Sequence, residues 1–403
     1  MVARTALLLL VLTMTATAQP PDPADAKMKA ALDAYQALVK EHAVALAEYQ
    51  QAAARAKTPE QKQELFRTRF PHASAYVERF AEVVRRYPTS PVAVEALVWI
   101  VTHPTAPDAR EATLRPQALD LLQSEYVKDE RVGRLCTQLV FSLDPASERF
   151  LRTVLEKSPL PAVQARACVS LAANLKHRGR LIRLLKDDAK GVAAQEQVWG
   201  KAAIAALVAR DPDRLLSEAA KLFQRVVDQY GDTRHPTHGT LGALARANLG
   251  AIRAPVDVDR VAPEIDGDDL AGKPLRLSEL RGKVVLVDFW GDGFAASRTN
   301  YPYERGLVYR LRKKPFVLVG VNADPDRADA RAAMQQEKLT WRSWWDGGGV
   351  GGPIATRWEI DLWPSLVLID HQGVVRGIWM GWPESKELDA AIDRLVDAAG
   401  RTE

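Results

Sequence analysis

Two cysteines, Cys136 and Cys168, are the only residues of the chain that could form a disulfide. Both lie in helical stretches, and two interpretations stay open: a structural disulfide between neighbouring helices, or two buried free thiols. A disulfide requires Cα atoms about 4.4–6.8 Å apart, a distance that the sequence does not give. There is no Cys-X-X-Cys motif, and His235 and His238 have no third ligand beside them. We therefore predict no metal site and no cofactor.

A second set of reactive side chains, Asp288 and Ser297, lies close together in the sequence. A serine acts as a nucleophile only with a base in reach, and the one histidine after residue 255 is His371, in a predicted turn far along the chain. We therefore expect no catalytic residue here. Ser297 is expected to cap a helix through its hydroxyl, and Asp288, in an apolar run, is expected to be structural.

The length of 403 residues favours two domains, and the first is predicted to be helical. From residue 25 to residue 254, apolar residues recur at three- and four-residue spacing. Helices should begin where a capping residue precedes proline, as in Thr58-Pro59, Ser90-Pro91, Asp144-Pro145 and Asp211-Pro212. Segments 76–88 and 219–231 resemble tetratricopeptide or HEAT-type helices, and both a stacked array and an irregular bundle remain open.

Residues 1–18 predict a cleavable signal peptide. Arg4 precedes an apolar run, and Ala16-Thr17-Ala18 precedes the expected cleavage site. Because the run is shorter than the ~20 residues that span a bilayer, we expect a periplasmic or secreted protein without a membrane span after cleavage. An uncleaved anchor is the alternative.

The charge pattern argues against nucleic acid as a partner. The net charge is only +4, and no aromatic residues are interleaved with the charges of the densest basic stretch, residues 176–190. This stretch is expected to be a solvated helix face.

After a predicted linker at 255–261, which opens with Pro255, the pattern becomes α/β from residue 262 to residue 399. Short apolar runs predict buried strands, with helices between and after them. The strands are expected at 284–289, 316–321, 365–369 and 374–380, and the helices at 297–312, 326–337 and 384–399. A turn at 371–373 should join the last two strands as a hairpin.

This order of elements resembles the thioredoxin fold, and several motifs resemble its redoxin branch, which includes alkyl hydroperoxide reductase/thiol-specific antioxidant-like proteins and exported thiol:disulfide interchange proteins. The motifs are Ala262-Pro263-Glu264-Ile265, residues 277–290, 340–346 and 352–355, and Trp363-Pro364-Ser365, which resembles the family's cis-proline. The resemblance implies a multidomain chain, with an N-terminal all-α helical-repeat-like region followed by a C-terminal α/β thioredoxin-like domain at 262–399.

In that family a Cys-X-X-Cys motif opens the helix after the first core strand, where the helix N-terminus stabilises a thiolate. The matching residues here are Phe294-Ala295-Ala296-Ser297, and residues 255–403 contain no cysteine. A Phe ring and a Ser hydroxyl form no disulfide, so the resemblance implies a domain that has lost thiol chemistry. Asp288 matches an acid that lies beneath the disulfide in thioredoxins.

The resemblance also implies a peptide groove, because the family's cis-proline exposes the preceding backbone to a substrate strand. The expected groove residues are Trp290, Phe294, Trp363 and Pro364. We therefore expect a redox-inactive module that binds a protein or peptide partner. One alternative is a thiol:disulfide oxidoreductase of the cell envelope, which would need Cys136 and Cys168 or a partner's thiol. Another is a helical scaffold to which the C-terminal domain is an appendage.

Overall fold

The computed structural model describes residues 23–401 except 57, 104, 106–109, 187, 348, 382 and 384, so the predicted signal peptide lies outside the described residues. The internal contacts of the chain divide it into two compact units. Of the described residues, the first unit contains those from 23 to 105 and from 110 to 118, and the second contains those from 119 onward. The segment predicted as a linker, 255–261, is irregular and lies within the second unit.

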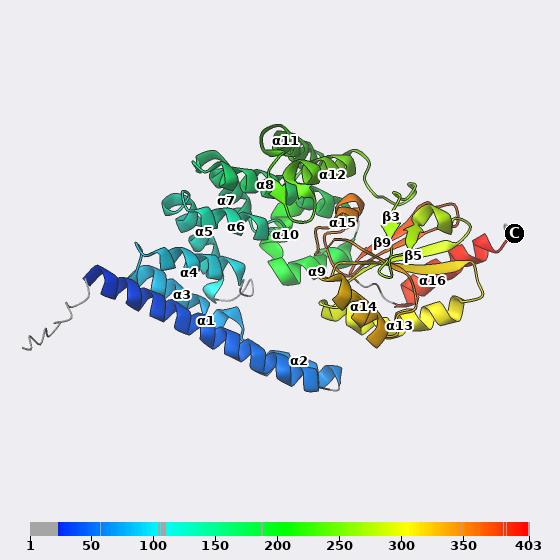
Figure 1. The fold of residues 1–403 in the computed structure, drawn as a ribbon, viewed down its shortest axis with the longest axis horizontal. Helices are drawn as coiled ribbons and strands as arrows, with labels where there is room; N and C mark the ends of the chain where they lie inside the picture. Colours follow the sequence, from blue (N-terminus) through cyan, green and yellow to red (C-terminus); the bar gives the residue numbers. More distant parts are fainter. Residues whose placement is uncertain are drawn as a thin grey trace, which may run out of the picture. The chain divides into compact units, whose positions relative to one another are not determined.

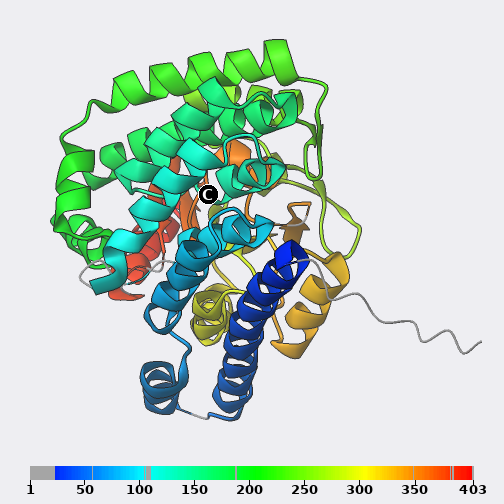
Figure 2. The ribbon, with the colours of Figure 1, turned by 90° about the vertical axis from the view of Figure 1, so that its left-hand side faces the viewer.

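The first unit is helical, and α1 packs beside α3 and α4 (Figure 2). Its helices are α1 (Pro23–Arg55), α2 (Pro59–Arg69), α3 (Val77–Arg86), α4 (Pro91–Thr102) and the start of α5 (Leu114–Glu125). Thr58 and Ser90 accept hydrogen bonds from the first turns of α2 and α4, as the sequence predicted. Phe80 and Trp99 stack in its core with ring centroids 4.1 Å apart.

Helices also make up the first part of the second unit, and α8 is their centre (Figure 1). They are α6 (Glu130–Gln138), α7 (Pro145–Lys157), α8 (Pro161–Leu185), α9 (Ala189–Trp199), α10 (Lys201–Val208), α11 (Pro212–Tyr230) and α12 (Leu241–Arg253). Asp144 and Asp211 cap α7 and α11, which confirms both predicted helix starts. The short antiparallel strands β1 (Arg234–His235) and β2 (Gly239–Thr240) interrupt the helical pattern. That these helices form a repeat stays a prediction.

The second part of this unit is a five-stranded sheet with helices on both faces. The strand order is β7-β6-β5-β8-β9, with β5 parallel to β6 and antiparallel to β8. The strands are β5 (Val284–Trp290), β6 (Phe316–Asn322), β7 (Ser343–Trp345), β8 (Ser365–Ile369) and β9 (Val375–Met380). The helices are α13 (Ala295–Leu311), α14 (Arg327–Gln336), α15 (Pro353–Trp358) and α16 (Ser385–Ala399). The sheet confirms the four predicted strands, and β7 and the ribbon of β3 (Asp266–Asp268) and β4 (Pro274–Arg276) are additional.

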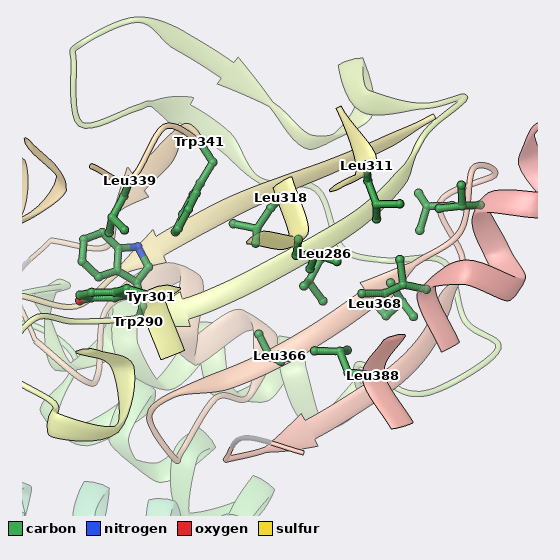
Figure 3. Packing of buried hydrophobic residues seen from close by; sticks show 14 of the residues in the cluster. Leu286, Trp290, Tyr301, Leu311, Leu318, Leu339, Trp341, Leu366, Leu368 and Leu388 are labelled. Carbon is green, nitrogen blue, oxygen red and sulfur yellow. The ribbon is translucent and has the colours of Figure 1, made fainter. Parts of the chain in front are cut away.

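The two faces of the sheet are built by alternate residues of each strand. Leu286 and Trp290 of β5 belong to the cluster that α13 and α16 cover, and Figure 3 shows Leu388 of α16 beside Leu366 and Leu368. The intervening β5 residues belong to a second cluster that contains residues of α15. By the same alternation, Asp288 lies on the α13 face, so a carboxyl group enters an apolar layer.

Candidate functional site

The candidate site lies where β5 ends and α13 begins. The connection turns tightly, because a Cβ on Gly291 would lie 2.8 Å from a ring carbon of Phe294. Asp324, just after β6, holds this turn through its buried carboxylate, which accepts hydrogen bonds from the N–H of Asp292 at 3.0 Å and of Gly293 at 3.2 Å. The ends of two neighbouring parallel strands therefore fix the position at which α13 starts.

Two half-buried aromatic rings form one wall of the site. Phe294 is the N-cap residue of α13, and its ring stacks on Trp363 with centroids 5.9 Å apart and planes 19° from parallel. The Trp363–Pro364 peptide bond is cis, as the sequence predicted. Among the described residues, none makes a hydrogen bond to the main-chain N–H or C=O of Trp363. Residues far apart in the sequence thus place a stacked aromatic pair next to unpaired backbone.

The other two residues predicted for the groove are placed differently. Trp290 is 1 % exposed and donates its indole N–H to Ser343 Oγ at 2.9 Å, in the core beneath α13. Its position at the end of β5 turns its ring inward, so Trp290 is not a groove residue. Pro364 is buried, and its C=O accepts a hydrogen bond from Gly381. It can contribute only through the conformation that it gives to Trp363.

Ser297 does not cap α13, which corrects the sequence prediction. The N-cap is Phe294, no side chain caps the helix, and Ser297 lies inside its first turn with 2 % exposure. The Ser297 hydroxyl accepts a hydrogen bond from the Gly291 N–H at 3.4 Å, so it steadies the same tight connection. A buried hydroxyl without a base beside it has no role as a nucleophile.

A buried pair of carboxyl groups, Asp288 and Glu304, lies beneath the site, and each residue is 1 % exposed. Burial raises the pKa of Asp288 to about 7, while burial and the nearby Asp288 raise the pKa of Glu304 well above its usual value. The two side chains hydrogen-bond to each other, which requires a proton on one of them. The sequence analysis missed Glu304, although Ser297, Tyr301 and Glu304 recur at the spacing of one buried helix face.

Both cysteines are buried free thiols in the helical part of the chain. Burial raises the pKa of Cys136 to about 12 and that of Cys168 to about 11. Reactive thiols require a lowered pKa and solvent access, and these two have neither. Within the described residues, no group of three or more His, Cys, Asp or Glu side chains could hold a metal ion.

The first part of the basic stretch, residues 176–180 of α8, is not a solvated face, which corrects the sequence prediction, whereas Arg183 and Lys186 further along are exposed. Arg180 is 8 % exposed, and its Nη1 lies 2.8 Å from Glu359 Oε2. His177 Nδ1 lies 3.1 Å from Asp361 Oδ2, which holds the pKa of that partly buried carboxyl at about 2 against the opposing effect of burial. Glu359 and Asp361 lie four and two residues before Trp363, so the helical part anchors the segment that carries the aromatic wall. The run of basic residues in the sequence did not reveal these ion pairs, because their acidic partners lie about 180 residues away.

The comparisons with known proteins each cover only part of the chain. The model of the AhpC/TSA family matches residues 258–378. The thiol-disulfide oxidoreductase ResA of Bacillus cereus is 23% identical over 158 residues, which cover 39% of this chain and 90% of that protein. ResA of Geobacillus thermodenitrificans is 24% identical over 155 residues, covering 38% and 87%. The solved thioredoxin domain of a thiol-disulfide oxidoreductase from Bacteroides vulgatus is 26% identical, with 35% and 98% covered and a TM-score of 0.32.

The described helices include none that is long and apolar enough to cross a membrane. The sheet order, the helix after β5, the cis-proline before β8 and the family match agree with one another. The C-terminal part of this chain is therefore a thioredoxin-like domain of the AhpC/TSA, or redoxin, family.

Proposed function

We propose that this thioredoxin-like domain is a redox-inactive module that binds an extended peptide or a protein segment. The observation that carries the proposal is the stacked pair of Phe294 and Trp363 beside the unpaired backbone of Trp363. Aromatic rings that are partly exposed offer apolar anchorage, and a free N–H and C=O offer pairing to an added strand. Leu362, at 42% exposure, adds an apolar side chain next to this backbone.

Binding to a permanently unfolded chain tests the proposal. The probe is reduced and carboxymethylated lactalbumin, which has no thiol, and the readout is the anisotropy of a fluorophore attached to it. We expect saturable binding that Phe294→Ala and Trp363→Ala each weaken by roughly tenfold, as loss of an anchor residue does. Tyr309→Ala is the matched control, because Tyr309 is an aromatic residue of the same helix with 68% exposure. Equal binding by all four proteins would refute the groove.

The second candidate is a thiol:disulfide oxidoreductase of the cell envelope, which the names of the matched relatives favour. Against it stand the lack of any cysteine after residue 168 and the raised pKa values of the two buried thiols. Reduction of insulin by dithiothreitol separates the two functions. We expect the wild-type protein to be silent and the Phe294→Cys, Ser297→Cys double variant to be active, with single variants as controls. Activity of the wild type would favour the oxidoreductase.

We also propose that the protein acts outside the cytoplasm, because its first 18 residues have the layout of a signal peptide. Expression of the full chain and of an Ala16→Arg, Ala18→Arg variant, followed by fractionation and mass determination, tests this. Export should shorten the wild type by 18 residues, whereas the variant should keep its full mass. A wild-type chain of full mass in the cytoplasm would contradict the proposal.

A further inference from the structure

A cavity of about 310 Å³ lies between α7, α8 and α10 in the helical part of the second unit. Four of its lining residues are arginines and one is an acid: Arg149, Arg152, Arg178, Arg210 and Glu148. We call this cavity the arginine pocket. It is independent of the groove proposed above, because it is built by the helical part alone.

The guanidinium groups are arranged from the outside inward. Arg149 is exposed, the side chains of Arg152 and Arg210 are about one third exposed, and that of Arg178 is 3% exposed. Arg178 is held in place through Nη2, which donates to the C=O groups of Ser142 at 3.0 Å and Asp144 at 2.9 Å. The deepest arginine is therefore fixed by the backbone, and a ligand from solvent can reach the others first.

The carboxylates around the arginine pocket do not balance its positive charge. Glu148 lies 2.8 Å from Arg152, 2.6 Å from Arg210 and 3.5 Å from Arg178, so one carboxylate serves three guanidinium groups. The lining carries four positive charges and one negative charge. Counting also Glu218, which pairs with Arg152, and Asp144, which caps α7, the cluster still has four positive charges against three negative ones.

The buried arginine has a donor left without a partner. Arg178 Nε is buried and has no hydrogen-bond partner among the described residues. Burial lowers the pKa of Arg178. The positive charges of Arg210 and Arg152 lower this pKa further, and the negative charge of Glu148 offsets part of the decrease. In every other described arginine with a shifted pKa, pairing with carboxylates raises it. The arginine pocket is thus short of acceptor oxygens and of negative charge.

The remaining lining is apolar, formed by Leu143, Pro145, Ala203, Ala206 and Leu207. Guanidinium forks match the paired oxygens of carboxylates and phosphates, and an apolar wall favours a ligand that also has a hydrocarbon part. We propose that the arginine pocket binds a small organic oxyanion, a carboxylate or phosphate monoester with a short apolar body.

Isothermal titration calorimetry on the full chain at low ionic strength tests the proposal. Phenyl phosphate and phenylacetate are the probes, inorganic phosphate tests the need for the apolar body, and benzyl alcohol tests the need for charge. We expect one molecule of at least one organic anion to bind per chain, at least tenfold more tightly than inorganic phosphate, and benzyl alcohol not to bind. Absence of heat with both organic anions would overturn the proposal, as would equally tight binding of inorganic phosphate, which would indicate a general ion site.

Variants locate the binding. Arg210→Gln removes a charge from the lining, and Ala203→Leu fills part of the cavity without changing any charge; each should weaken binding at least tenfold. Arg183→Gln is the matched control, because it removes one charge from α8 at an exposed pair with Asp213. Thermal unfolding without ligand verifies that each variant is folded. Equal weakening by Arg183→Gln and Arg210→Gln, or no effect of Ala203→Leu, would show general attraction to a basic surface and refute the arginine pocket.

Discussion

Individual side chains of the thioredoxin-like domain illustrate how position decides what a residue can do. Phe294 and Ser297 are three residues apart, yet the Phe294 ring is half exposed while Ser297 is buried at 2% exposure. The sequence alone could exclude a disulfide at both positions, because neither residue type carries a thiol. The partner of Asp288 could not be predicted from the sequence, since Glu304 comes close to Asp288 only when α13 packs against β5.

The buried pair of Asp288 and Glu304 makes the stability of the domain fall as pH rises. Both pKa values are higher in the folded state than in the unfolded chain, so between about pH 4 and pH 7 the folded state holds more protons. The contribution of this pair to the free energy of unfolding has its full value below pH 4 and is lost as the pH rises through the folded-state pKa values. Asp346, whose pKa burial raises to about 7, acts in the same direction.

Glu304→Gln should therefore reduce the loss of stability between pH 5 and pH 9. The amide can donate to the Asp288 carboxylate without binding a proton, so the difference between variant and wild type should be on the order of a few kcal/mol at pH 9. Urea unfolding followed by Trp fluorescence measures it, because eight of the ten Trp residues lie after residue 255. The exposed Glu279→Gln is the control. An unchanged pH dependence in Glu304→Gln would contradict the shared proton.

At the scale of elements, features that depend on neighbouring residues were predicted correctly from the sequence, and features that depend on distant residues were not. Proline after a capping residue marked the starts of α2, α4, α7 and α11, because a helix start is determined by a few neighbouring residues. Apolar runs marked β5, β6, β8 and β9. The three-residue strand β7 was missed because it is defined by pairing with β6, and the basic part of α8 was misassigned because its burial depends on Glu359 and Asp361.

The contact between α8 and the segment before β8 should make a measurable contribution to stability. The side chains of Arg180 and Glu359 are 9% and 5% exposed, so removal of one leaves a buried charge without its partner. We expect Arg180→Met to lower the free energy of unfolding by about 3–5 kcal/mol. The double variant Arg180→Met, Glu359→Gln should recover much of that loss. Additive effects in a double-mutant cycle would show that the two charges are not coupled.

At the scale of the whole molecule, the second unit joins helices and a thioredoxin-like sheet through buried polar contacts. Lys176 and Arg180 of α8 are both buried, and Lys176 Nζ donates to Asn248 of α12 at 2.8 Å, while α12 in turn packs on α15. Groups of this kind cannot be exposed one at a time without losing their partners. The helical part and the sheet of this unit should therefore open together, although their sequences resemble separate domains.

Hydrogen exchange of the full chain, measured by mass spectrometry at increasing urea concentrations, tests this cooperativity. Amides of α8 and of β5 and β8 should reach a common opening free energy, because each of these elements loses buried contacts when the other opens. Arg180→Met should lower protection in α8 and β8 alike and leave α3 and α4 of the first unit unchanged, since the substituted contact lies wholly in the second unit. If β8 keeps its protection while α8 loses it, the sheet is an autonomous domain and the joint opening is wrong.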